Sequence, residues 1–301
     1  MRILVTGGTG FIGQHLIAQL PQDCHVTVLT RRPEVAKQLW QERVVAIGSL
    51  PSVDEFEQYD AVINLAGEPI ADKRWSQQQK RRICDSRWTL TEKIADAIQA
   101  CASPPVFISG SAIGYYGDQQ QRVVDEATQP DQQLLADDFA HRVCAEWEKR
   151  AARVAQQTRV CIVRTGIVLS PGFGAMKKML PPYRLGLGGP MGTGQQFMSW
   201  IHIDDMVALL LFLLNNPKAS GIYNATAPSP VTNRVFSRQL AATLKRPHVF
   251  TTPAFVLKLA FGEMANLLLT GQQVKPTRLL EAGFEFQYPE LQGALTNLLR
   301  D

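Results

Sequence analysis

The stretch Thr6-Gly7-Gly8-Thr9-Gly10-Phe11-Ile12-Gly13 follows the apolar run Ile3-Leu4-Val5 and leads directly into a helical pattern. This order predicts a strand, a tight glycine turn and a helix. Gly7 can take the turn without a Cβ atom, Gly10 lets backbone come close to a ligand, and Gly13 lets the helix lie close on the strand. The free N–H groups of the first helical turn, which begins at Phe11 and Ile12, suit a pyrophosphate. We therefore predict a dinucleotide site here, against the alternative of a purely structural turn.

The composition predicts an ordinary soluble globular protein. The chain has 301 residues, of which 45% are hydrophobic and 19% charged, enough for one large α/β domain with a smaller cap or for two domains. The net charge of +4 gives little reason to expect nucleic acid or a membrane as the main partner. The longest apolar run, Met206 to Leu214, is too short to span a bilayer, and the N-terminus shows no signal peptide. Five scattered cysteines without a CxxC pair favour reduced thiols in a cytoplasmic protein.

The chain alternates strand-like and helix-like segments up to about Gly166. Apolar runs predict strands at residues 26–29, 44–47, 60–67, 106–108 and 160–163, and helical patterns cover residues 77–101 and 131–155. Such an alternation indicates a parallel sheet covered on both faces. We therefore predict an α/β fold, a Rossmann-like doubly wound parallel sheet, whose ligands bind beyond the carboxyl ends of the strands.

The pattern changes after Gly166. Pro, Gly and Met become frequent from Pro171 to Gly194, and only short elements follow. We predict a cofactor domain over residues 1–166, to which later segments return, and a smaller C-terminal, substrate-side lobe over residues 167–301. Within that lobe, the apolar stretch from Leu180 to Pro190 is either a mobile surface loop or the lining of a pocket.

The end of the second strand indicates which dinucleotide binds. In a NAD site a carboxylate about 20 residues past the glycine turn takes the ribose hydroxyls. Here the strand ends in Thr30-Arg31-Arg32. Because arginine offers a planar fork of donors that matches phosphate, NADP(H) is favoured over NAD(H). The alternative is a pair of solvated surface arginines.

Further motifs carry a family resemblance. The sequence resembles the extended short-chain dehydrogenase/reductase superfamily in residues 6–13, in Asn64-Leu65-Ala66-Gly67 and in Ser109-Gly110-Ser111. Within that superfamily it is similar to the YfcH-type epimerase family proteins, which carry a C-terminal domain of unknown function. The segments that carry this closer resemblance are Gly67-Glu68-Pro69-Ile70, Arg74-Trp75, Ser86-Arg87, Gly114-Tyr115-Tyr116-Gly117, Arg164-Thr165-Gly166, Leu185 to Pro190, Trp200 to Asp205, Pro230 to Asn233 and Gly271 to Val274.

The resemblance covers essentially the whole chain and implies a Rossmann-like fold that binds NADP(H). It implies cofactor contacts beyond the glycine turn, with Arg87 toward the cofactor phosphates, but it supplies no substrate. These further contacts are Leu65, Ala66, Gly67, Arg87, Ser109, Gly110 and Arg164.

One departure from the superfamily bears on the chemistry. The superfamily places a Tyr-x-x-x-Lys pair on the helix after the serine strand, where lysine lowers the tyrosine pKa and tyrosine moves a proton. In this chain Phe139 and Val143 fall at those positions, and no Tyr-x-x-x-Lys occurs elsewhere. Neither side chain can transfer a proton, so the usual acid is missing.

Three groups remain near the expected nicotinamide as candidate catalytic residues. Ser111 matches the superfamily serine that hydrogen-bonds a substrate oxygen, although a plain turn serine is equally compatible with the pattern. Tyr115 or Tyr116 could donate the proton instead of the missing tyrosine. The alternative for both rings is packing, with the hydroxyl bonded inside the protein.

Two charged groups of residues have structural alternatives. The basic cluster Lys73, Arg74, Lys80, Arg81, Arg82 and Arg87 fits a solvated helix face better than a nucleic-acid surface, because few aromatic residues accompany it. His202 with Asp204 and Asp205 could hold a metal, but two carboxylates before an apolar helix are better explained as helix caps, so we expect no metal site.

Three functional hypotheses follow. The first is an NADP(H)-dependent oxidoreductase or epimerase that acts on a small substrate, nucleotide-linked compounds included, with a non-standard proton donor. The second is a catalytically weak NADP(H)-binding sensor or scaffold, and the third, a nucleic-acid binder, has the least support. Because superfamily members often pair through their two long helices, the resemblance also implies a homodimer.

Overall fold

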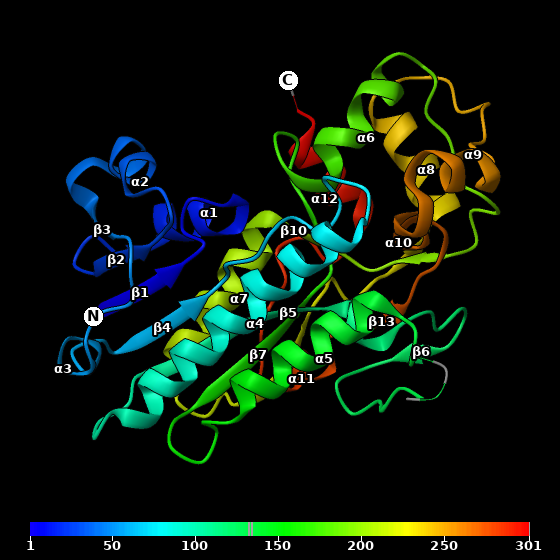
Figure 1. The fold of residues 1–301 in the computed structure, drawn as a ribbon. Coiled ribbons are helices and arrows are strands. Elements are labelled where there is room, and N and C mark those ends of the chain that lie inside the picture. Colours follow the sequence, from blue (N-terminus) through cyan, green and yellow to red (C-terminus); the bar gives the residue numbers. More distant parts are fainter. Residues whose placement is uncertain (132, 134, 301) are drawn as a thin grey trace.

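The fold is built on a seven-stranded parallel sheet (Figure 1). The computed structural model describes residues 1–131, 133 and 135–300. The strands are β1 (Arg2–Thr6), β2 (His25–Leu29), β3 (Val44–Ile47), β4 (Ala61–Asn64), β5 (Val106–Ala112), β7 (Val160–Thr165) and β11 (Gly221–Ala225). Their order across the sheet is β11-β7-β5-β4-β1-β2-β3, and each pairing is parallel. The predicted Rossmann-like parallel sheet is therefore confirmed.

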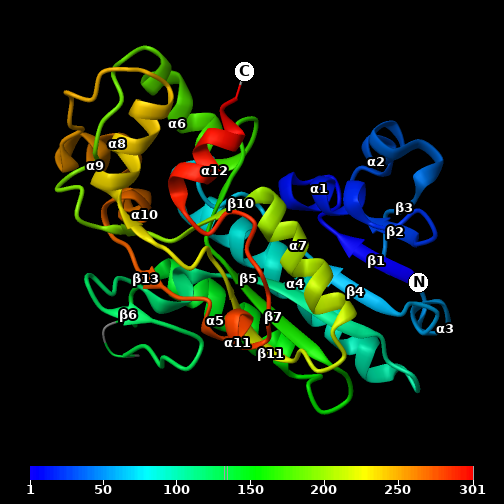
Figure 2. The ribbon, with the colours of Figure 1, turned by 180° about the vertical axis from the view of Figure 1, so that it is seen from behind.

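Two helical layers cover the sheet because successive strand residues point to opposite faces. Ile3 and Val5 join the core beneath α1 and α7, whereas Leu4 joins the core beneath α4 and α5. Figure 1 shows the α4 and α5 layer in front of the sheet, and Figure 2 shows α7 in front of it. The helices of these layers are α1 (Phe11–Gln19), α2 (Pro33–Trp40), α4 (Gln77–Ala100), α5 (Phe139–Ala152) and α7 (Ile203–Asn215).

The structure corrects the predicted helix over residues 131–155. Residues 132 and 134 lie outside the described residues, and α5 begins only at Phe139. The carboxylate of Asp138 accepts a hydrogen bond from the backbone N–H of His141 at 2.9 Å, which caps the helix there. Upstream, Asp131 accepts from the backbone N–H of Gln133 and forms its own turn. Asp138 is thus the helix cap, and Asp131 is a turn residue upstream of the helix.

The order of the strands reverses between β1 and β4. From β1 the chain continues to β2 and β3 on one side, and it reaches β4, β5, β7 and β11 on the other. Ligands of open α/β sheets bind beyond the carboxyl ends of the strands at such a point. Gly7 follows β1 there and Leu65 follows β4, so two of the predicted cofactor segments begin at this switch point. We call the region beyond these strand ends the crevice.

The lobe beyond residue 166 has its own apolar core, which includes Met176, Trp200 and Phe236. Two later elements, α7 and β11, return to the sheet domain. The lobe helices are α6 (Gly174–Arg184), α8 (Asn233–Thr243), α9 (Ala254–Phe261), η3 (Gly262–Ala265), α10 (Asn266–Leu269) and α12 (Leu291–Leu298). Its short strands are β8 (Ile167–Leu169), β9 (Phe197–Met198), β10 (Trp200–His202) and β12 (Val231–Thr232). Connecting elements are η1 (Gln41–Arg43), α3 (Val53–Phe56), η2 (Ile113–Tyr116), β6 (Val123–Val124), β13 (Gln273–Val274) and α11 (Thr277–Glu281).

Candidate functional site

The glycine turn has the geometry that a bound diphosphate needs. Gly7 has a φ of 72°, and the N–H of Gly10 donates to the carbonyl of Gly7 at 2.9 Å. A Cβ atom on Gly13 would lie 2.4 Å from that same carbonyl, so the close approach predicted for Gly13 is to the turn rather than to the strand. No side chain caps α1 at Gly10. The first-turn N–H groups, at Phe11 and Ile12, therefore lack a side-chain cap of their own.

A buried hydrogen-bond network that sequence reasoning missed fixes the two strand ends. The hydroxyl of Thr6 donates to Asn64 Oδ1 at 2.6 Å, and Asn64 Nδ2 donates to the hydroxyl of Thr91 on α4 at 2.8 Å. The indole N–H of Trp147 on α5 also donates to Thr91, at 2.9 Å. These bonds position Leu65, Ala66 and Gly67 at the crevice. The sequence signal that could have revealed this network is a polar residue at the end of each of two neighbouring strands, Thr6 and Asn64.

The end of β2 presents two free cations. The side chains of Arg31 and Arg32 are exposed, and neither guanidinium has a hydrogen-bond or ion-pair partner among the described residues. The hydroxyl of Thr30 accepts the backbone N–H of Arg32 at 3.2 Å, which shapes the turn. Since β2 pairs with β1, both arginines lie at the same sheet edge as the glycine turn. We call the glycine turn together with these arginines the glycine end of the crevice.

Arg87 projects from α4 against Gly67. Its Nη1 donates to the carbonyls of Glu68 at 3.0 Å and Ile83 at 3.1 Å, and its guanidinium lies over the Trp147 ring. A Cβ atom on Gly67 would come within 2.7 Å of the guanidinium carbon. No carboxylate forms an ion pair with Arg87 among the described residues, and burial lowers its pKa. It is a cation held by neutral partners beside the crevice.

Ser111 and Arg164 are both committed to a buried carboxylate that the sequence did not single out. The hydroxyl of Ser111 donates to Glu148 on α5 at 2.6 Å, while Nε and Nη2 of Arg164 donate to the two oxygens of Glu148 at 2.8 Å each. Burial alone would lower the pKa of Arg164, but Glu148 outweighs burial and raises it. Beside them, Ser109 is fully buried and Gly110 packs against Trp147. These groups hold β5, β7 and α5 together.

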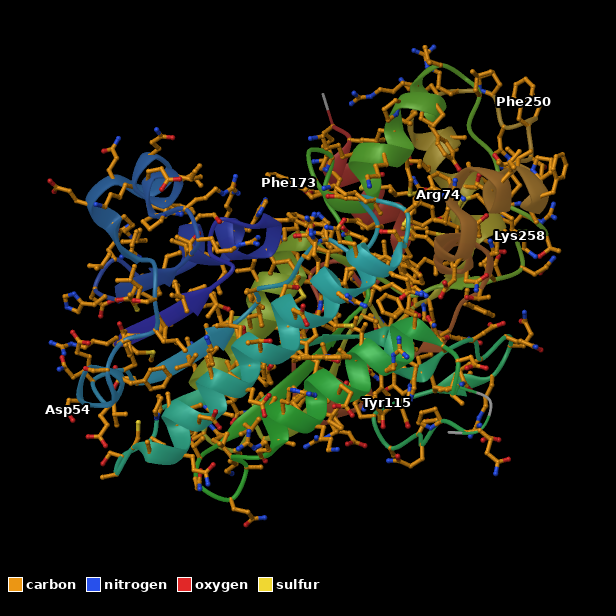
Figure 3. The ribbon with its side chains drawn as sticks, in the orientation of Figure 1. Asp54, Arg74, Tyr115, Phe173, Phe250 and Lys258 are labelled. Carbon is orange, nitrogen blue, oxygen red and sulfur yellow. The ribbon has the colours of Figure 1, made fainter. Side chains whose placement is uncertain are left out.

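The two tyrosines differ in what their hydroxyls contact. Tyr116 is fully buried, and its hydroxyl, which has one proton to donate, lies 2.9 Å from both the Asp125 carbonyl oxygen and Asn224 Oδ1. Burial raises the pKa of Tyr116 to about 12. Tyr115, labelled in Figure 3, is half-buried, and its hydroxyl has no hydrogen-bond partner among the described residues. The Arg164 guanidinium lies over its ring, 3.5 Å from the centroid. Tyr115 is therefore the tyrosine with hydrogen-bonding capacity to offer a ligand.

Buried apolar side chains occupy the positions of the superfamily's Tyr-x-x-x-Lys pair. Phe139 and Val143 are buried in an apolar cluster with Ile83 of α4, and the Trp75 ring meets Phe139 edge-on at 4.8 Å. Two basic groups lie over the Phe139 ring, with Lys80 Nζ 5.0 Å and the Arg142 guanidinium 5.7 Å from its centroid. We call this region, with Ser111, Tyr115 and Tyr116, the serine end of the crevice.

Contacts across the crevice tie the sheet domain to the lobe. Phe11 at the glycine turn stacks on Phe173 at the start of α6, with ring centroids 4.9 Å apart. Lys80 pairs with Glu263 of η3 at 2.6 Å. Lys178 of α6 pairs with Asp72 at 2.7 Å. The lobe thus lies directly beside both ends of the crevice.

The structure gives His202, Asp204 and Asp205 structural roles that differ from those predicted. The helix α7 begins at Ile203, and the cap is the imidazole of His202, which accepts the backbone N–H of Asp204 at 3.0 Å. The carboxylate of Asp205 accepts the backbone N–H groups of Gln287 and Tyr288. The prediction that both carboxylates are caps was therefore wrong. No cluster of three or more metal-ligating side chains occurs within the described residues.

Together, the doubly wound sheet and the glycine turn at its switch point define a Rossmann-like protein. More specifically, the chain belongs to the NAD dependent epimerase/dehydratase family, whose model matches residues 3–226, and residues 252–298 match DUF1731, a domain of unknown function. The resemblance seen in the sequence is thereby confirmed.

Relatives span nearly the whole chain. The human epimerase family protein SDR39U1 is 38% identical over 99% of this chain and 100% of its own length. The chloroplastic SDR39U1 homolog of Arabidopsis thaliana is 39% identical and matches over 100% of this chain and 87% of its own.

Solved structures agree with this assignment. Human SDR39U1, crystallised with NADPH, superimposes with a TM-score of 0.88 at 36% identity over 99% of both chains. A nucleoside-diphosphate sugar epimerase from Corynebacterium glutamicum matches with a TM-score of 0.77 at 28% identity, over 99% of this chain and 58% of its own. A UDP-glucuronic acid 4-epimerase from Bacillus cereus shares the fold, with a TM-score of 0.77 at 17% identity.

Proposed function

We propose that the protein binds NADP(H) at the glycine end of the crevice. The observation that carries this proposal is the pair of unpartnered arginines, Arg31 and Arg32, at the same sheet edge as a helix N-terminus without a side-chain cap. A 2′-phosphate needs such a cationic fork, and a pyrophosphate needs such a helix end. Human SDR39U1, which shares this fold over its whole length, was crystallised with NADPH.

The proposed reaction is that of an oxidoreductase or epimerase on a small substrate, nucleotide-linked compounds included. NADP(H), when bound, supplies hydride transfer. The chain then has to move a proton without a Tyr-x-x-x-Lys pair. Tyr115 is the proposed donor because its hydroxyl has no hydrogen-bond partner among the described residues. The hydroxyl of Tyr116, in contrast, is hydrogen-bonded to Asp125 and Asn224. The Arg164 guanidinium, 3.5 Å from the Tyr115 ring centroid, holds that ring in place.

A second function, a catalytically weak NADP(H) sensor or scaffold, is favoured by one observation. Phe139 and Val143 are packed into an apolar cluster rather than facing a solvated site. This arrangement leaves no room for a proton relay at those positions, while the glycine end keeps its ligand-binding groups.

The remaining partner hypotheses have less support. Lys80 is paired with Glu263 and Arg87 is turned toward backbone carbonyls, so the basic cluster offers fewer free cations to nucleic acid than its sequence suggests. The homodimer through α4 and α5 stays a prediction. Their described surface carries ion pairs such as Arg153 with Asp96, and the strongly exposed large apolar side chains lie elsewhere.

A hydride-transfer assay separates the two functions. NADPH oxidation and NADP⁺ reduction would be followed on a broad panel of carbonyl compounds and sugar nucleotides. Turnover that responds to Tyr115→Phe supports the enzyme, with Tyr288→Phe, another half-buried tyrosine, as the matched control. Saturable NADPH binding without turnover on the whole panel would favour the sensor.

A further inference from the structure

The outer corner of the lobe exposes an unusual concentration of apolar side chains. Side chains on α9 are among the most exposed, with Phe255 at 71% and Leu259 at 79%. Of the eight residues of α9, only Leu257 is buried, although nearly all are apolar. A helix that is apolar all round requires a covering surface. The exposed apolar residues of this corner are Leu185, Leu187, Val249, Phe250, Phe255, Val256 and Leu259.

These side chains come from neighbouring segments. The segment after α6 runs beside the segment before α9, because the N–H of Thr252 donates to the Pro190 carbonyl at 2.9 Å and the N–H of Gly192 donates to the Thr252 carbonyl at 2.8 Å. Both ribbon views place the end of α6, α8 and α9 together, at the corner remote from β1 to β3. Figure 3 shows Phe250 and Lys258 on the outer side of this corner.

Buried hydrogen bonds hold the two segments in place. The hydroxyl of Tyr183 lies 2.6 Å from Ser237 Oγ and 3.2 Å from the Gly189 carbonyl oxygen, within hydrogen-bond distance of both. The same Ser237 hydroxyl bonds His248 Nε2 at 2.8 Å. The exposed tips, Leu185 and Val249 among them, are thus presented by an ordered scaffold and cannot simply fold back into the core.

The exposed charged side chains on these segments are positive, and the neighbouring carboxylate, Glu263 of η3, is paired with Lys80. Arg184, Lys245, Arg246 and Lys258 are exposed, and none of their side chains has a partner among the described residues. Between residues 149 and 262 the sequence contains only two carboxylates, Asp204 and Asp205, both on α7. The net charge of +4 conceals this asymmetry because the balancing carboxylates lie elsewhere in the chain. We call the seven apolar residues together with these four cations the corner patch.

We propose that the corner patch docks on the anionic headgroups of a membrane surface. Apolar tips that enter the headgroup boundary, ringed by lysine and arginine, are the composition of an interfacial contact. A second copy of the chain fits poorly, because a two-fold contact would place the same cations against each other. With eight residues α9 is too short to cross a bilayer, and no helix within the described part of the chain is long and apolar enough to do so.

This inference revises the expectation that a membrane is not a partner, which rested on net charge and on the lack of an apolar run long enough to span a bilayer. It does not depend on the proposed function, because the corner patch lies outside the crevice. Each cation near an anionic surface contributes about fivefold to binding, and raising the ionic strength from about 0.1 M to about 1 M shortens the Debye length from roughly 10 Å to 3 Å. Binding should therefore be strongly sensitive to salt.

Vesicle flotation tests the proposal with the full chain. The probes are phosphatidylcholine vesicles with and without phosphatidylglycerol. We expect binding only to the anionic vesicles and at least a tenfold loss in Phe255→Ser/Leu259→Ser. The reversal Lys245→Glu/Arg246→Glu changes the charge by four units, so we expect a loss of roughly several hundredfold. The matched controls are Leu280→Ser, an exposed leucine on α11, and the double reversal Lys37→Glu/Lys93→Glu far from the corner. Both controls should bind like the wild type.

Three outcomes overturn the proposal. The first is no binding of the wild type to anionic vesicles. The second is equal loss in the corner variants and the matched controls, which would mean non-specific attraction. The third is a wild-type dimer in light scattering that Phe255→Ser/Leu259→Ser converts to monomer without any vesicle binding by the wild type, which would make a second copy the occupant. Circular dichroism melting of each variant confirms that it is folded.

Discussion

At the glycine end of the crevice Arg31 and Arg32 face no partner in the protein, whereas at the serine end Arg164 is clamped by Glu148 in a buried bidentate pair. The same contrast holds for hydroxyls, since that of Tyr115 is free and that of Ser111 is committed to Glu148. A residue type matched to a family motif therefore indicates a ligand contact only once its partners inside the protein are known. Here the glycine end has polar groups that are free to bind a ligand, whereas most polar groups of the serine end are bonded to other groups of the protein.

The largest expected effect lies at the serine end. If Tyr115 donates the proton, Tyr115→Phe should lower turnover by about 10² to 10⁴ with NADPH affinity unchanged. Tyr116→Phe should instead cost about 1 kcal/mol of unfolding free energy, because its hydroxyl bonds Asp125 and Asn224. Steady-state kinetics and urea unfolding of both variants check this. Unchanged turnover in Tyr115→Phe would leave bound water, Ser111 or the substrate as the donor.

The next effect concerns the buried pair. Glu148→Gln leaves the Arg164 cation buried with reduced compensation, so we expect a loss of about 3 to 5 kcal/mol in unfolding free energy. Glu146→Gln on the same helix is the matched control, because its pair with Arg150 is partly exposed and worth at most about 1 kcal/mol. Equal losses in the two variants, measured by denaturant titration, would show that Glu148 is not the structural centre of the serine end.

Substitutions at the glycine end should change NADPH affinity and leave the free energy of unfolding nearly unchanged. A Cβ at Gly10 meets only the Gly7 carbonyl, at 3.1 Å, so Gly10→Val should fold. Its branched side chain would occupy the place of the pyrophosphate and remove at least two charged hydrogen bonds, which lowers NADPH affinity about a hundredfold or more. Gly293→Ala on α12, where a Cβ meets nothing within 4 Å, is the control for glycine replacement. Normal NADPH binding by folded Gly10→Val would make the glycine turn purely structural.

The smallest effect separates the two cofactors. Arg31→Ala removes a charged hydrogen bond to the 2′-phosphate worth roughly 1.5 to 3 kcal/mol, so NADPH should bind about tenfold or more weakly while NADH is nearly unaffected. Arg238→Ala, an exposed arginine on α8, should leave both affinities unchanged. If Arg31→Ala loses affinity for NADPH and NADH equally, Arg31 does not bind the 2′-phosphate and instead supports the folded structure.

The sheet was predictable because short apolar runs leave few alternatives to buried parallel strands. The runs at residues 26–29 and 44–47 match β2 closely and β3 in full. The glycine turn was predictable because a Cβ atom on Gly7 or Gly13 would collide with neighbouring backbone atoms. At these two positions a local steric requirement determines the residue.

The serine end was less predictable because its roles depend on contacts between distant residues. Glu148 looks like an ordinary charged position of an amphipathic helix, and only the approach of β5 and β7 shows that it binds Ser111 and Arg164. The start of α5 was misplaced because the predicted helix ran through Asp138, a residue type that favours caps and that caps α5 here. The exposure of α9 also escaped notice, since an apolar helix is normally buried.

Calorimetric titration of the wild-type protein with NADPH and with NADH tests the central claim most directly. If the free arginines of the glycine end await a 2′-phosphate, NADPH binds at least about tenfold more tightly than NADH, which corresponds to roughly 1.5 kcal/mol or more. Equal affinities for the two cofactors, or no binding of either, would contradict the claim that the glycine end is an NADP(H) site.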